Sequence, residues 1–115
     1  MFRGKLGKGR IQPKRDGSMN LLEKTYAVHL EGRKQAGEIL RYDFEPEKLR
    51  LADRTFYEPD FRVQLADGAI EFHEVKGHWE EDARVKIKVA AEQHPYRFCA
   101  VTRKKKNDPW ATEEF

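Results

Sequence analysis

The dipeptide Asp67-Gly68 stands between two runs of residues in which apolar and polar side chains alternate. The first run covers residues 55–65 and the second covers residues 70–76. Alternation with a period of two is typical of a half-buried β-strand, and Asp-Gly is a strong signal for a tight turn between paired strands. The sequence therefore predicts a β-hairpin, which must lie in a sheet that other elements cover.

Helical patterns are found on both sides of this hairpin. Apolar residues recur at helical spacing over residues 19–36, and Gly37 is a typical residue just past a helix end. A second helical pattern covers residues 80–93, and Pro95 prevents its continuation. Further strands are predicted at residues 39–44 and 98–102, with a short extended piece at residues 49–52. The sequence therefore predicts an α/β fold in the order α-β-β-β-α-β, with helices packed against a mixed β-sheet.

Positive charge is concentrated towards the two ends of the chain. Residues 1–17 hold six basic residues and one acidic residue, whereas residues 18–102 hold 13 basic and 16 acidic residues. Basic segments beside an acidic body suit a polyanion such as nucleic acid, although solubility alone would also explain them. At a length of 115 residues, we expect a basic arm at residues 1–17, one domain at residues 18–102, and a basic then acidic tail at residues 103–115.

Several classes of protein are excluded by what the sequence lacks. Cys99 is the single cysteine, so an intramolecular disulfide and a zinc ribbon are excluded, and a reducing, cytoplasmic setting is expected. No segment approaches the ~20 apolar residues of a membrane span. The sequence has no phosphate-binding glycine loop, so no nucleotide cofactor is expected.

Three ionisable residues near the hairpin are candidates for catalysis. Asp60 lies in the first run, and Glu74 and Lys76 project from one face of the second because side chains alternate along a strand. This face also carries Phe72, so unpaired charges there would be costly. An ion pair between Glu74 and Lys76 would explain them, but a metal site would also explain Asp60. The pattern favours two carboxylates that hold a divalent cation beside a lysine, an arrangement suited to phosphodiester hydrolysis.

Glu23 falls on the apolar stripe of the first predicted helix. It can face the sheet and complete the site, or it can form a capping box with Asn20 as the N-cap, and the two interpretations are compatible. None of the four histidines has a metal-ligand spacing to another histidine or to Cys99. We therefore interpret all four as surface residues: His29, His73, His78 and His94.

The Pro59-Asp60 dipeptide and the Glu74-Val75-Lys76 tripeptide resemble the signature of the PD-(D/E)xK nuclease superfamily. The predicted order of elements around them agrees with that superfamily, and it implies a restriction-endonuclease-like core. More narrowly, three segments look like the phage endonuclease I family of Holliday-junction resolvases, and equally like small phage-encoded nucleases of unassigned substrate: YEPDF, EVKGHWEEDARVKIKVAAEQHP and LLEKTYAVHLEGRKQAGEI. The resemblance extends from about residue 19 to residue 102.

The resemblance implies a metal-dependent endodeoxyribonuclease. The metal ion would be Mg²⁺, with Mn²⁺ able to substitute, and its ligands would be Asp60, Glu74, the carbonyl of Val75 and Glu23. Lys76 would orient or deprotonate the attacking water and stabilise the charge that develops on the phosphate. A set of basic residues would contact DNA: Arg84, Lys86, Lys88, Lys104, Lys105 and Lys106.

The expected partner is DNA, including branched DNA, and the expected assembly is a homodimer, located in the host cytoplasm if the protein is phage-encoded. Candidate dimer surfaces are the strand at residues 39–44 and the tail with Trp110 and Phe115, although these aromatics would equally cap the core of a monomer. Two alternatives stay open beside a junction resolvase. One is a non-specific DNA nickase, and the other is a non-catalytic nucleic-acid-binding module on a nuclease fold.

Overall fold

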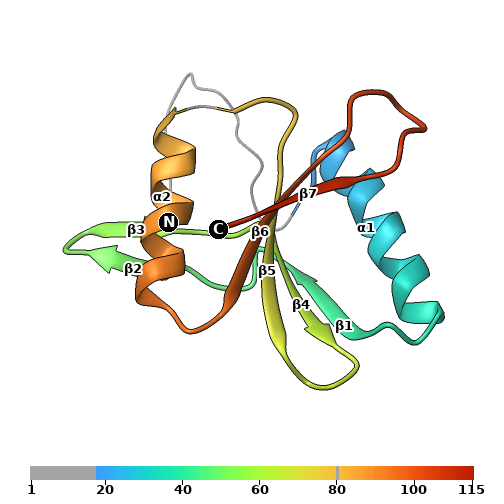
Figure 1. The fold of residues 1–115 in the computed structure, drawn as a ribbon, viewed down its shortest axis with the longest axis horizontal. Coiled ribbons are helices and arrows are strands. Elements are labelled where there is room, and N and C mark those ends of the chain that lie inside the picture. Colours follow the sequence, from blue (N-terminus) through green and yellow to red (C-terminus); the bar gives the residue numbers. More distant parts are fainter. Residues whose placement is uncertain (1–17, 80) are drawn as a thin grey trace.

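The computed structural model describes residues 18–79 and 81–115, in which helices cover both faces of a five-stranded mixed sheet (Figure 1). The elements are α1 (Leu21–Gln35), β1 (Ile39–Phe44), β2 (Leu49–Ala52), β3 (Thr55–Tyr57), β4 (Phe61–Leu65), β5 (Ile70–Val75), α2 (Glu81–Gln93), β6 (Arg97–Thr102) and β7 (Ala111–Glu114). The predicted α/β class and mixed sheet are confirmed. The predicted basic arm, residues 1–17, lies outside the described residues.

The strands of the main sheet lie in the order β1-β4-β5-β6-β7. Only β5 and β6 pair in parallel, because α2 connects them, and the other neighbouring strands are antiparallel. Strands β2 and β3 form a separate two-stranded sheet that contacts α2. The elements of the main sheet follow the predicted order α-β-β-β-α-β, with the additional strand β7 at the end. When the small sheet is included, five strands rather than three precede α2 in the part of the chain that the structure describes.

Two predictions about the strands are corrected by the structure. The run at residues 55–65 is not one strand, because residues 58–60 separate β3 from β4 and send them into different sheets. Pro59 accounts for the break, since it has no N–H with which to continue a ladder. The tail at residues 103–115 contains β7, which was not predicted and which pairs with β6 from Thr102 to Cys99.

The two faces of the main sheet pack against different elements. The face towards α1 has a core that contains Tyr26, Leu30, Phe61, Val63, Val75 and Val101. The face towards α2 and the small sheet has a core that contains Leu49, Leu51, Tyr57, Phe72, Ile87, Ala90 and Phe98. Odd-numbered residues of β5 therefore face α1 and even-numbered residues face α2, as the period of a strand requires. Neither described helix is long and apolar enough to cross a membrane.

The turn between β4 and β5 depends on Gly68, as the sequence predicts. Its φ angle is +94°, and its N–H donates to the carbonyl of Leu65 at 2.9 Å. A residue with a Cβ is disfavoured at positive φ by about 1 kcal/mol or more. Asp67 supports the turn by accepting a hydrogen bond from the Ala69 N–H at 2.9 Å.

Alanine substitutions at two glycines should change stability in opposite directions. Gly68→Ala should lower the free energy of unfolding by about 1 kcal/mol because of its φ angle. Gly32 lies inside α1, and no neighbouring atom lies within 4 Å of the place that a Cβ would occupy, so Gly32→Ala should raise stability by roughly 0.5–1 kcal/mol. Urea unfolding of both variants measures the two effects, and a Gly68→Ala variant with undiminished stability would contradict the assigned turn.

Candidate functional site

Asp60 and Glu74 lie side by side where β4 begins and β5 ends. The antiparallel pairing of these strands ends with Phe61 opposite His73, which brings Asp60 and Glu74 to the next position along the ladder. Oδ2 of Asp60 accepts a hydrogen bond from the Val75 N–H at 2.9 Å. Both carboxylates are buried, with 7% and 9% of their residues' surface exposed. The structure therefore brings together two of the residues that the sequence pattern selected as metal ligands.

The Glu74 carboxylate is held from both sides. The Tyr57 hydroxyl donates to Oε1 at 2.6 Å, and Nζ of Lys76 lies 3.3 Å from Oε2. Burial, followed by the negative charge of Glu74, raises the pKa of Tyr57, so its hydroxyl stays protonated and can donate. The ion pair between Glu74 and Lys76 is thus present. It was one of the two explanations for the position of both charged residues on an apolar face of the strand. Tyr57 was not recognised in the sequence, because the break at Pro59 that brings it here was not predicted.

A cavity of about 200 Å³ opens beside Glu74, and its lining residues are Tyr57, Glu58, Glu74, Ala83 and Lys86. Lys86 reaches it from α2, whereas Glu74 comes from the sheet. Two neighbouring buried carboxylates disfavour each other's charge, and a divalent cation between them removes that penalty. Carboxylate oxygens are also the ligands that Mg²⁺ takes. The donor set at Asp60 and Glu74 therefore fits such an ion, and Lys76 and Lys86 lie near Glu74.

Glu23 begins α1 as part of a capping box. Its N–H donates to Oδ1 of Asn20 at 2.8 Å, and its Oε1 accepts from the Asn20 N–H at 3.0 Å. The side chain is buried, with 4% exposed. Within residues 18–79 and 81–115, Glu23 does not form with Asp60 and Glu74 a set of three ligand atoms that all lie within 4.8 Å of one another. The capping interpretation is confirmed, and a role in metal binding stays a prediction.

The basic residues selected for DNA contact lie in two different environments. Arg84 donates to Glu113 of β7 at 2.5 Å, and its guanidinium lies over the rings of Trp79 and Phe115, so it tightens the protein's own packing. The remaining basic residues are exposed on α2 or in the loop between β6 and β7: Lys86, Lys88, Lys104, Lys105 and Lys106. These exposed cations can approach a polyanion without breaking a contact with an acidic partner that the structure records.

The aromatic residues of the C-terminal segment pack against the chain itself. Trp110 meets Tyr26 edge to face at 4.9 Å between ring centroids, and Phe115 meets Trp79 at 6.0 Å. Trp110 packs against the core on the α1 face, and Phe115 packs against the core on the α2 face. Of the candidate dimer surfaces, β1 lies at one edge of the main sheet and exposes 53% of Leu40. A homodimer therefore stays a prediction, with the β1 edge as its better-placed surface.

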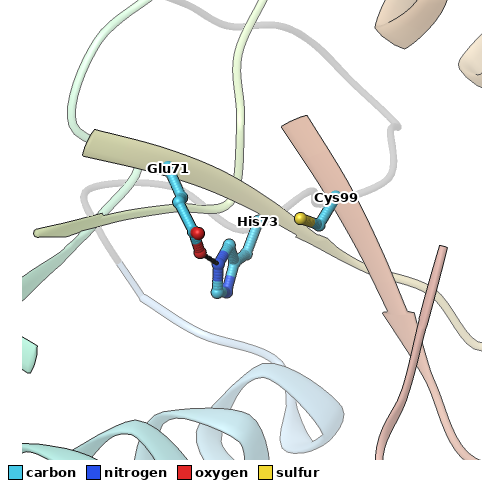
Figure 2. A group of neighbouring side chains, drawn as sticks. All are labelled: Glu71, His73 and Cys99. Atoms are coloured by element: carbon cyan, nitrogen blue, oxygen red, sulfur yellow. Dashed lines mark hydrogen bonds and ion pairs between the residues drawn. The ribbon is translucent and has the colours of Figure 1, made fainter. Parts of the chain in front are cut away.

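The interpretation of all histidines as surface residues is wrong for His73. This residue is 4% exposed and lies among Glu71, Cys99 and Tyr26 on the α1 face of the sheet. Figure 2 shows Glu71 and His73 side by side on β5 and Cys99 beside them on β6. The spacing in the sequence missed this group because His73 and Cys99 meet through the parallel pairing of two strands. The alternation of Glu71 and His73 on an otherwise apolar face was the available signal.

Comparisons of this chain with known protein families, with curated protein sequences and with solved structures give no match. Any role of Asp60, Glu74 and Lys76 therefore has to be inferred from their geometry and from the resemblance of their sequence pattern.

Proposed function

We propose that this chain is a metal-dependent endodeoxyribonuclease that hydrolyses phosphodiester bonds in DNA. The observation that carries the proposal is the convergence of two buried carboxylates, Asp60 and Glu74, with Nζ of Lys76 at 3.3 Å from the second. A cluster of buried ionisable groups beside a cavity is a typical feature of functional sites, although ion pairs that only stabilise a fold also form such clusters. The α-β-β-β-α-β order along the main sheet also supports a restriction-endonuclease-like core.

Each residue of the site has a distinct role in this proposal. Asp60, Glu74 and the carbonyl of Val75 would hold Mg²⁺ or Mn²⁺, and the ion would neutralise charge on the scissile phosphate. Lys76 would orient the attacking water, accept or pass on its proton, and stabilise the negative charge of the transition state. Tyr57 would keep the Glu74 carboxylate in one orientation through its 2.6 Å hydrogen bond.

DNA would approach the site along α2. Lys86 lines the cavity beside Glu74, and Lys88 follows it on the same helix. A phosphate near Glu74 would therefore meet two cations, Lys76 just past the end of β5 and Lys86 from α2. The exposed lysines at 104–106 extend this positive charge beyond β6, where backbone contacts fix the position of a duplex without reading its sequence.

The direct test is an incubation of the full chain with supercoiled plasmid, linear duplex, single strands and a four-way junction, in Mg²⁺ and in EDTA. We expect cleavage in Mg²⁺ alone. A preference for the junction of tenfold or more, about 1.4 kcal/mol, together with a dimer by light scattering, would support a resolvase. Cleavage of all duplexes alike would indicate a nickase. Binding to DNA without any cleavage in Mg²⁺ or Mn²⁺ would replace the proposal with a non-catalytic binding module.

Tyr57→Phe should separate positioning of the carboxylate from the chemical step. The substitution removes only the hydroxyl that bonds Glu74, so we expect the Mg²⁺ concentration for half-maximal cleavage to rise about tenfold, the lower range for an outer-shell partner. Maximal cleavage at saturating Mg²⁺ should fall much less. Tyr96→Phe, at an exposed residue 43% accessible, is the matched control. An unchanged Mg²⁺ dependence in Tyr57→Phe would remove Tyr57 from the site.

A further inference from the structure

The α1 face of the sheet holds a second group of potential ligand atoms, separate from the carboxylate pair. Glu71, His73 and Cys99 each offer one atom, and these three atoms all lie within 4.8 Å of one another. All three residues are buried, with 3–5% exposed. Because Glu71 and His73 are odd-numbered residues of β5, they face away from Glu74. The group is therefore independent of the proposed nuclease site.

Two of the three side chains are oriented by partners at their outer atoms. The Tyr26 hydroxyl is hydrogen-bonded to Nδ1 of His73 at 2.7 Å, and Arg97 binds Oε2 of Glu71 at 2.5 Å. These bonds turn Nε2 of His73 and Oε1 of Glu71 towards each other, 2.9 Å apart (Figure 2). Histidine ligands of metal ions characteristically bond their second nitrogen in this way.

Cys99 completes the group from the neighbouring strand. It is the register partner of His73 in the parallel pair of β5 and β6, and Figure 2 shows its sulfur directed towards the imidazole. Across residues 18–79 and 81–115, no hydrogen bond is recorded for this thiol, although only 3% of the residue is exposed. The thiol is thus a buried group that points into the cluster and has no recorded hydrogen-bond partner among the described residues.

We propose that Glu71, His73 and Cys99 bind a Zn²⁺-class transition-metal ion. A sulfur, a nitrogen and an oxygen ligand suit Zn²⁺ and do not suit Mg²⁺. In a tetrahedral site with bonds of about 2.0–2.3 Å, ligand atoms stand roughly 3.3–3.8 Å apart. The 2.9 Å contact between Glu71 and His73 has to widen slightly, and the contacts of the sulfur, which are no longer than 4.8 Å, have to shorten by at most about 1.3 Å.

The cavity beside the cluster can hold the fourth ligand. Its volume is about 270 Å³, and its lining includes Glu71, His73, Cys99, Tyr26 and Trp110. A water molecule bound there would complete a site with three protein ligands. Burial raises the pKa of the Cys99 thiol to about 11, so metal binding has to displace its proton to the buffer. Without an ion, Tyr26, His73, Glu71 and Arg97 form a hydrogen-bonded cluster beside the buried Cys99, which is the competing interpretation.

The test uses Co²⁺ as a spectroscopic probe on the full chain under reducing conditions. A thiolate bound to Co²⁺ gives a charge-transfer band in the near ultraviolet, and Cys99 is the single cysteine that could produce it. We expect one equivalent of Co²⁺ to produce this band and Zn²⁺ to bleach it. Cys99→Ser should abolish the band, and Glu71→Gln should weaken binding about 10²-fold or more, beyond the loss of an outer-shell partner.

Two controls keep the result assignable to this cluster. His94→Gln changes a histidine that bonds the carbonyl of Arg50 outside the cluster, and it should leave the band unchanged. Asp60→Asn should also leave it unchanged, whether or not the nuclease proposal holds. No band from the unsubstituted chain at excess Co²⁺ would overturn the proposal without reference to any variant. The proposal would also be overturned if both Cys99→Ser and Glu71→Gln bound Zn²⁺ with the same stoichiometry and affinity as the unsubstituted chain.

Discussion

Asp60→Asn should reduce Mg²⁺-dependent DNA cleavage on the order of 10³-fold or more while leaving the fold intact. The amide oxygen of asparagine can still accept the hydrogen bond from the Val75 N–H, which is 2.9 Å from Asp60 Oδ2, so the start of β4 keeps its connection to β5. What the variant loses is one negative charge at the proposed metal site. Loss of a charged ligand removes several kcal/mol of stabilisation from the transition state.

The measurement is the rate of nicking of supercoiled plasmid, with thermal unfolding recorded on the same preparation. Asp67→Asn is the matched control, because it makes the same chemical change in the exposed turn and its amide oxygen can keep the bond to Ala69. Its cleavage rate should equal that of the unsubstituted chain. Nicking by Asp60→Asn at the original rate, or full activity of the original chain in EDTA, would end the proposed mechanism.

Lys76→Ala should lower the single-turnover rate of cleavage about 10²-fold, the scale of one group that stabilises charge in the transition state. Nζ of Lys76 lies 3.3 Å from Glu74 and 5.6 Å from the centre of the Trp79 ring, so the protein holds it beside the carboxylates. DNA affinity should change little, because most contacts with a duplex are made elsewhere. The rate has to be measured at saturating protein, which separates cleavage from binding.

Lys86→Ala is the comparison for Lys76→Ala. Lys86 is exposed and lines the same cavity, so its removal should weaken binding more than it slows cleavage at saturation. The reverse pattern, in which Lys76→Ala loses affinity while its saturated rate persists, would show that Lys76 is a binding residue.

Local signals in the sequence were sufficient for several elements. Helix α1 begins at the capping box of Asn20 and Glu23 and ends before Gly37, whose φ angle is positive. Gly68 makes the turn between β4 and β5. The alternation along β5 also placed Glu74 on the side opposite His73. These features depend on residues close together in the chain, where backbone geometry and side-chain period decide the outcome.

Features that depend on distant pairing could not be predicted. Strand β7 has the sequence Ala-Thr-Glu-Glu, which carries no apolar alternation, and all four residues are exposed. It is a strand because β6 offers a free edge, and Arg97 binds Glu114 across the pair. The contact of His73 with Cys99 has the same origin, since parallel pairing brings together residues 26 positions apart in the sequence.

Strand β5 carries ionisable residues on both of its faces, and this limits the changes of length that the strand can tolerate. A slip of β5 by one residue against β4 would turn Glu74 towards Tyr26 and Val63, and it would turn Val75 into the cavity. Burying that carboxylate among apolar groups would cost several kcal/mol. Insertions or deletions of a single residue should therefore be excluded between Phe61 and Val75. Changes of length are expected instead at the exposed residues 104–107 of the loop between β6 and β7, where peptide tags or extra binding segments can be accommodated.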